Sequence, residues 1–110
     1  MLDVFAALQS AQVPAYRGAF RPTEGRPEPP DTYCVYTLSR TPDWPADDGN
    51  TVERLTTFVH LYALGDPEDT EAAIEAAMQL QGFALVRVND DYVDGSGHYE
   101  ALSEWSAVRR

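Results

Sequence analysis

Five acidic and histidine residues near the C-terminus form the one group in the sequence whose residue types could bind a metal ion. They are Asp90, Asp91, Asp94, His98 and Glu100. Their spacing does not match the calcium loop D-x-[DN]-x-[DN]-G, because Asp90 and Asp94 are four residues apart and a glycine follows Asp94 directly. The Cys and His spacing of zinc sites is absent as well. Since Asp and Gly favour turns, we interpret the segment as a solvated hairpin tip and expect no metal.

His60 is the other residue that could take part in catalysis. It stands in the middle of a strand-like run, between Phe58 and Tyr62, with no nucleophile beside it in the sequence. The chain has no G-x-S-x-G motif, no phosphate-binding glycine loop and no paired Cys/His motif. We therefore predict a protein that is not an enzyme and uses no cofactor, in which His60 is a packed or interface histidine.

The second half of the chain predicts the elements that hold these residues. Residues 51–64 are rich in β-branched and aromatic residues and predict a long strand. Asp66 is a candidate N-cap with Pro67 at the first helical position, and the helix runs to residue 81 before Gly82. We assign a stripe of Ile74, Ala77, Met78 and Gln81, with Ala73, Ala76 and Leu80 beside it, to the side that covers a sheet. Two strands follow, over residues 83–89 and 98–108, joined by D-Y-V-D-G-S-G.

The first half predicts fewer elements and more loop. An amphipathic helix is expected over residues 2–12, and a short strand over residues 15–20. The proline-rich residues 21–31 predict an extended loop, residues 32–40 a strand, and residues 41–50 a loop.

These elements together predict one α+β domain spanning residues 1–110. The expected architecture is an antiparallel sheet of four to five strands packed by two helices. The order along the chain is helix, strand, strand, strand, helix, strand, strand.

The composition is that of a globular acidic protein. The formal net charge is −10 with 44% hydrophobic residues, and the chain contains no lysine. Residues 1–40 balance four acids with four arginines, whereas residues 41–108 carry fourteen acids against Arg54 and Arg87. Binding to free nucleic acid requires clustered cations, so this class of function is excluded. No transmembrane helix or secretory signal is expected, and the single Cys34 is expected to be a buried small hydrophobe.

The strand at residues 51–64 has bulky side chains on both faces. Leu55, Val59, Leu61 and Ala63 occupy one face, and Phe58, His60 and Tyr62 occupy the other. A strand with one solvated face should alternate with polar residues. The second face therefore requires a covering layer, which the N-terminal helix or another subunit could supply.

The order and character of these segments resemble one protein family. The quoted segments are A-Y-R-G-A-F, the aromatic Y-C-V-Y, the strand E-R-L-T-T-F-V-H-L-Y-A-L, the helix E-D-T-E-A-A-I-E-A-A-M and the closing V-N-D-D-Y-V-D-G-S-G-H-Y-E-A-L-S-E-W-S-A-V. With a short N-terminal helix before them, they resemble the tail terminator (tail completion) proteins of long-tailed bacteriophages and prophages. The resemblance spans nearly the whole chain, although the loop at Trp44 does not align.

This resemblance implies a structural virion protein that assembles in the host cytoplasm into a ring, typically a hexamer. The ring caps the finished tail tube and joins it to the head-closure or neck protein. DNA passes through it without specific binding, no membrane takes part, and no catalytic residues carry over.

Two sets of residues follow as hypotheses. We expect the subunits to meet through the hairpin of residues 32–64, with the interface side chains Phe58, His60, Tyr62 and Trp44. A lumen lined with carboxylates would repel passing DNA, and the loop acids expected there are Asp47, Asp48, Asp90 and Asp91.

Three alternatives stay open. The first is a head-closure or other head–tail connector protein. The second is a monomeric acidic inhibitor or immunity-type protein that binds a basic partner. The third is a metal-dependent enzyme using the turn between Asp90 and His98.

Overall fold

The structure is a computed structural model that describes residues 2–22, 24–25, 30–45, 51–93 and 98–109. Its elements are α1 (Val4–Ser10), β1 (Ala15–Arg17), β2 (Thr32–Pro45), β3 (Thr51–Ala63), α2 (Glu68–Gln81), β4 (Ala84–Val93) and β5 (His98–Arg109). The predicted α+β class and the predicted order of elements are both confirmed.

The strands form one five-stranded sheet in the order β1-β2-β3-β5-β4. The four long strands pair antiparallel as predicted, but β1 pairs parallel to β2, with Ala15 opposite Cys34. The sheet is therefore mixed, and the prediction of a purely antiparallel sheet is wrong. Residues 18–31 connect β1 to β2 and are long enough for the crossover that a parallel pair requires.

Two strands are longer than the sequence predicted. β2 continues to Pro45 through residues expected to form a loop, with a register shift between Pro42 and Trp44. Proline cannot donate to a sheet ladder, so it is tolerated at bulges and sheet edges. Here β1 pairs with β2 only at residues 34–36, which leaves the outer edge of β2 beside Pro42 without a described neighbouring strand. β4 likewise runs to Val93, past the predicted end at residue 89.

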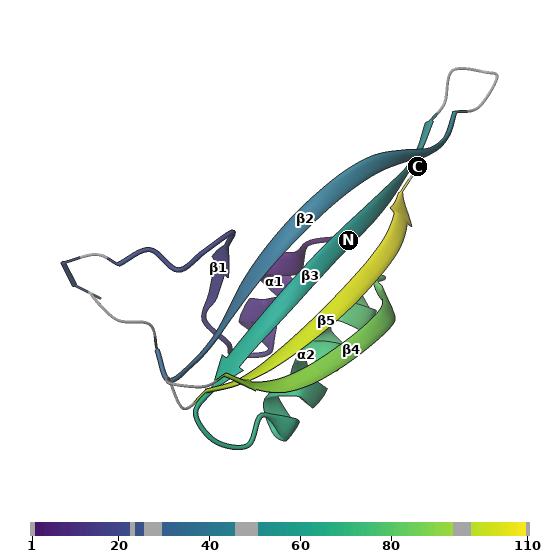
Figure 1. Ribbon diagram of the computed structural model, residues 1–110. Coiled ribbons are helices and arrows are strands. Elements are labelled where there is room, and N and C mark those ends of the chain that lie inside the picture. The colour runs from purple at the N-terminus through teal and green to yellow at the C-terminus, as the bar shows by residue number, and fades with distance from the viewer. Residues whose placement is uncertain (1, 23, 26–29, 46–50, 94–97, 110) are drawn as a thin grey trace.

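Both helices pack on the same face of the sheet, behind the strands in Figure 1. Val4, Ala7 and Leu8 of α1 are buried in one cluster with Ile74 and Met78 of α2. The sheet residues of that cluster include Cys34, Leu55, Val59, Leu61, Ala101 and Trp105. The possibility that the N-terminal helix covers the face of Phe58, His60 and Tyr62 is therefore wrong.

Local signals fix the ends of α2 close to where the sequence placed them. The Asp66 carboxylate accepts a hydrogen bond from the Glu68 N–H at 3.0 Å, while Pro67 occupies the N-cap position itself. Pro67 therefore lies one position earlier than predicted. At the other end Gly82 adopts a left-handed conformation with φ of 104°, which favours glycine. A Cβ added there would lie 3.2 Å from the Leu2 side chain, so the glycine also allows the N-terminal segment to pack close.

Two apolar residues of α2, Ala76 and Leu80, face solvent against the sequence-based expectation. Ile74, Ala77 and Met78 are buried against the sheet, whereas Leu80 is 87% exposed. A position two residues after Met78 lies about 200° around a helix of 3.6 residues per turn, so the two side chains point in nearly opposite directions. Leu80 thus belongs to the outer face of α2.

Candidate interaction surface

The face of the sheet opposite the helices is the candidate functional site, and we call it the open face. Along β3, Thr57, Val59 and Leu61 are buried under the helices, so Phe58, His60 and Tyr62 between them point to the opposite side. Directly paired residues of neighbouring strands share a face. The open face therefore comprises Tyr33, Val35 and Thr37 of β2, Thr56, Phe58, His60 and Tyr62 of β3, and Glu100, Leu102 and Glu104 of β5. No helix among the described residues covers it (Figure 1).

Aromatic rings cover the end of the open face next to β1. Tyr33 and Tyr62 are stacked with ring centroids 5.0 Å apart and an interplanar angle of 20°. Tyr16 meets Tyr33 at 6.2 Å and Phe20 edge-on at 5.0 Å. Such ring pairs stabilise one another beyond the area that they bury. This end is therefore a preformed aromatic surface that a partner can contact without first ordering it.

A histidine–carboxylate pair lies beside the rings. The Nδ1 atom of His60 is 2.9 Å from an Oε1 atom of Glu100, and their side chains are 31% and 29% exposed. The His60 ring also lies parallel to Tyr62, with centroids 6.4 Å apart. The pair lies among aromatic rings on the uncovered face, a setting that suits recognition or packing.

The same carboxylate affects the nearby tyrosines. Partial burial raises the pKa of Tyr62, and the negative charge of Glu100 and a hydrogen bond to it act in the same direction. Burial first and Glu100 second also raise the pKa of Tyr33. Both phenols therefore stay protonated at neutral pH, and the Tyr62 hydroxyl donates its hydrogen bond to the Glu100 carboxylate.

The end of the open face next to β4 is polar. Arg87 of β4 pairs with Glu104 of β5 at 3.0 Å, and the Arg87 side chain is 64% exposed. Arg54 donates a hydrogen bond to the Ser106 hydroxyl at 2.9 Å. Aromatic and aliphatic side chains with a charged rim are the usual make-up of a protein–protein contact surface.

The structure leaves most of the other predicted site residues untested. The side chain of Trp44 lies outside the described residues, although its backbone belongs to β2. Asp47 and Asp48 lie outside them entirely. The backbones of Asp90 and Asp91 belong to β4, opposite Ala101 and Glu100, so their expected position in a loop is wrong.

The described side chains include only part of the predicted metal-binding group. Within the described ranges no three His, Cys, Asp or Glu side chains come close enough to hold a metal ion. Asp94 lies outside those ranges, as do the side chains of Asp90, Asp91 and His98. Glu100, the remaining member of the predicted group, faces His60 on the open face. Cys34 is buried, and burial raises the pKa of its thiol to about 12, so it is an inert core residue as expected.

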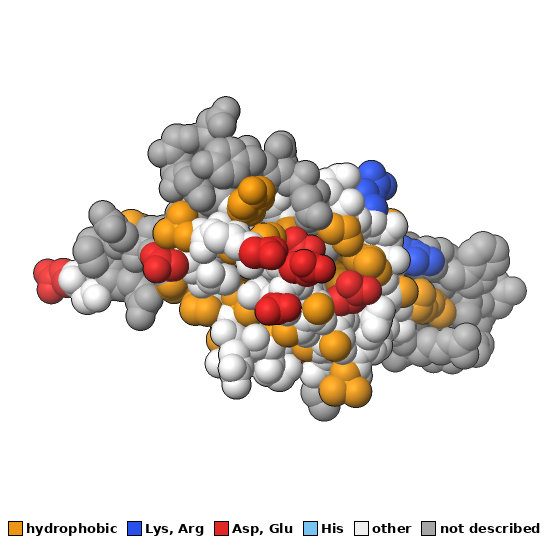
Figure 2. Space-filling model, turned by 90° about the horizontal axis from the view of Figure 1, so that it is seen from below, with side chains coloured by type: hydrophobic (Ala, Val, Ile, Leu, Met, Phe, Trp, Pro, Cys, Tyr) orange, Lys and Arg blue, Asp and Glu red, His pale blue; other side chains and the backbone are white. Residues whose placement is uncertain are grey.

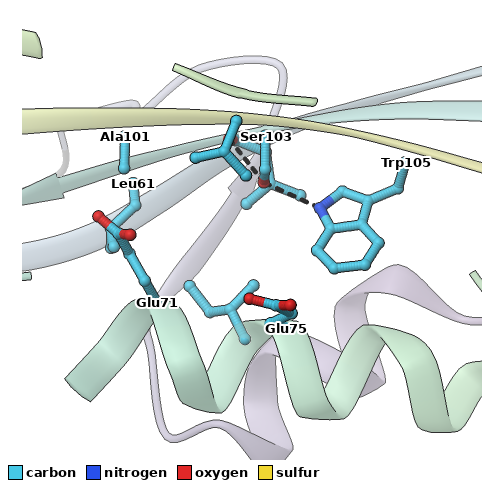
Figure 3. Close-up of a pocket in the computed structure, with 9 residues that line it drawn as sticks. Leu61, Glu71, Glu75, Ala101, Ser103 and Trp105 are labelled. Carbon is cyan, nitrogen blue, oxygen red and sulfur yellow. Dashed lines mark hydrogen bonds between the residues drawn. The ribbon is translucent and has the colours of Figure 1, made fainter. Parts of the chain in front are cut away.

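The cavity between α2 and the sheet is too small for a substrate. Figure 3 shows Glu71 and Glu75 of α2 on one side and Leu61, Ala101 and Trp105 of the sheet on the other. Its volume is about 30 Å³, whereas sites for small molecules measure roughly 300–1,000 Å³. Trp105 donates its indole N–H to the Ser103 hydroxyl at 2.8 Å, which satisfies the one polar group of the ring. This space is a packing gap.

Several members of the open face were missed in the sequence. Tyr16, Tyr33 and Leu102 were not singled out, and Glu100 was grouped with the turn acids. Tyr33 alternates with the buried Cys34, and the register of β2 with β3 places it opposite Tyr62. Strand alternation, combined with that pairing register, would have identified Tyr33 as a member of the open face.

No helix of the described residues has the length and apolar composition needed to cross a membrane. Neither a protein-family model nor a curated protein matches this chain in sequence.

Proposed function

We propose that this protein is a structural, ring-forming subunit of a bacteriophage tail, of the tail terminator type, and that its subunits associate through the open face. The observation that carries the proposal is the uncovered sheet face built from Phe58, Tyr62, Tyr33 and Leu102. A two-layer domain buries one face of its sheet by itself and needs a partner for an apolar second face. The resemblance in element order supports the tail terminator assignment.

In this proposal the ring caps the tail tube and connects it to the neck, and the chain carries out no chemistry. The acidic loops, with Asp47 and Asp48, face the DNA passage and repel phosphate over about 8 Å at physiological salt. Asp90 and Asp91 of β4 take the same role only if that strand borders the lumen.

The proposal is tested by the mass of the pure protein over a concentration series, measured by light scattering, together with negative-stain images. We expect a ring of several subunits. Phe58→Glu should reduce it to monomers, because assembly would bury an unpaired charge. Phe5→Glu is the matched control: it makes the same change at a half-exposed phenylalanine of α1, away from the open face, and should leave the ring intact.

A wild-type protein that stays monomeric at high concentration and in assembled tails would overturn the proposal. The acidic surface of α2 favours a second candidate, an inhibitor that caps a basic partner. Figure 2 shows acidic side chains gathered in the middle of the surface seen from below Figure 1. That candidate predicts a stable monomer, so the same mass measurement separates the two.

A further inference from the structure

Two surfaces in the described part of the chain lack a covering layer. One is the open face. The other is the outer face of α2, where Ala72, Ala76 and Leu80 follow one another at spacings of four residues, all exposed. At such a spacing the three side chains form one stripe along the helix. Leu80 is the most exposed large hydrophobic residue described, at 87%.

We propose that the outer face of α2 in one subunit packs onto the open face of the next subunit, so that the ring is joined head to tail. This inference rests on the proposed function, since it assumes that the chain assembles with itself. The occupant of the open face is then α2 of the neighbouring subunit, and α2 forms the second half of the interface.

Layer packing is the first argument. Inside the subunit α2 already lies on one face of the sheet with its stripe of Ile74, Ala77 and Met78. Its opposite stripe can lie on a second sheet in the same way. Ala72 and Ala76 allow the helix axis to approach closely, and Leu80 supplies the large side chain that would pack among Phe58 and Leu102.

Charge is the second argument. The stripe on α2 is flanked by the exposed acids Glu68, Asp69 and Glu75, without a basic residue in the helix. The open face offers Arg87 at its rim. One carboxylate already pairs with Arg87, but its guanidinium is 64% exposed and has five N–H donors, so it can bind a second carboxylate.

Symmetry gives the consequence for assembly. Contact between two different surfaces is heterologous, and repeated contacts of this kind close into a ring or extend into a filament. Contact of the open face with itself would be isologous and would stop at a dimer. A ring therefore requires the kind of pairing that α2 and the open face can form.

The test uses two single-surface variants of the full chain. Phe58→Glu prevents binding through the open face and leaves the α2 stripe intact. Leu80→Glu prevents binding through the α2 stripe and leaves the open face intact. Each alone should be monomeric. Mixed in equal amounts, they should form a one-to-one dimer and nothing larger, because only one contact remains possible. Sedimentation velocity over a concentration series measures this, since a single contact is weaker than a closed ring.

Controls keep the outcome unambiguous. Phe5→Glu, which changes a half-exposed residue of α1 outside both surfaces, should assemble as the wild type does. Ala76→Arg should block assembly as Leu80→Glu does, and circular dichroism should show both variants folded. If Leu80→Glu and Ala76→Arg assemble normally while Phe58→Glu does not, the α2 contact is wrong and the ring proposal survives. Two monomeric variants that fail to associate when mixed also overturn the α2 contact. A monomeric wild type overturns both proposals.

Discussion

The two faces of the sheet are formed by the same strands but differ in burial, because the helices of the subunit cover one of them and the other is the open face. On the helix-covered face Leu55, Val59 and Leu61 are 1–2% exposed, and aliphatic side chains and Trp105 fill the space against α1 and α2. On the open face Phe58 and Tyr62 are half-buried, and they are accompanied by the ion pair of Arg87 and Glu104. Burial of the first face stabilises the subunit. Ring stacking and ion pairing hold the side chains of the second face in place. Part of its apolar surface stays exposed to solvent, so its burial against a partner would be favourable.

Because neighbouring residues of a strand point to opposite faces, stability and recognition can be changed separately at adjacent positions. The difference between the faces therefore leads to predictions in which matched substitutions have unequal effects.

The largest effect is expected from removing the central ring of the covered face. Trp105→Ala should lower the free energy of unfolding by about 3–5 kcal/mol, because Trp105 is fully buried and its loss leaves a cavity. Phe58→Ala on the open face should cost the monomer about 1 kcal/mol, since its ring is only partly buried there. Urea unfolding monitored by circular dichroism measures both. Equal costs would show that the open face is part of the folding core.

The next effect compares the two sides of α2 at adjacent positions. Ala77 is 9% exposed against the sheet, so Ala77→Arg should destabilise the protein by about 3 kcal/mol through overpacking and burial of charge. Ala76→Arg on the outer face should change the stability of the monomer by less than about 0.5 kcal/mol. Thermal and urea unfolding of the two variants side by side is the measurement. An unchanged Ala77→Arg protein would mean that α2 does not pack on the sheet as described.

A smaller effect is expected where local capping, not packing, holds α2. Asp66→Ala removes the acceptor of the Glu68 N–H and should cost about 1 kcal/mol. Glu75→Ala removes a carboxylate from the exposed middle of the same helix and should stay within about 0.5 kcal/mol of the wild type. Urea midpoints at pH 7 are sufficient to compare the two. A cost for Asp66→Ala no greater than that for Glu75→Ala would show that packing alone fixes the start of α2.

The smallest effect concerns alkaline pH and the tyrosines of the open face. In the folded protein, burial and then the negative charge of Glu100 raise the pKa of Tyr33 and Tyr62 above the ordinary value of about 10, so the unfolded chain loses these phenolic protons first. The stabilisation is therefore complete below pH 10 and is lost as the pH rises through the higher folded pKa values. Tyr62→Phe should make the decline of stability between about pH 9 and 11 shallower. If stability declines with pH in this variant as it does in the wild type, Tyr62 does not contribute to the decline.

Much of the fold was predictable from local signals. Strand alternation in residues 51–64 identified both faces of β3, and Leu55, Val59, Leu61 and Ala63 are buried as expected. The sequence Asp66-Pro67 and Gly82 placed the ends of α2 within a residue, because capping depends on the backbone conformation of a few neighbouring residues. The order of the elements and the α+β class followed from these local assignments.

Tertiary structure decided the rest. The parallel pairing of β1, the extension of β2 through Pro42 and the placement of both helices on one face each depend on contacts between segments far apart in the chain. Leu80 is a further example. Its apolar side chain is compatible with either side of α2, and only the packed structure shows which side contacts the sheet. The sequence by itself determined which side chains of β3 share a face. Whether a face is covered was settled only when α1 and α2 packed together behind the sheet, because burial is a property of the assembled layers and not of any single strand.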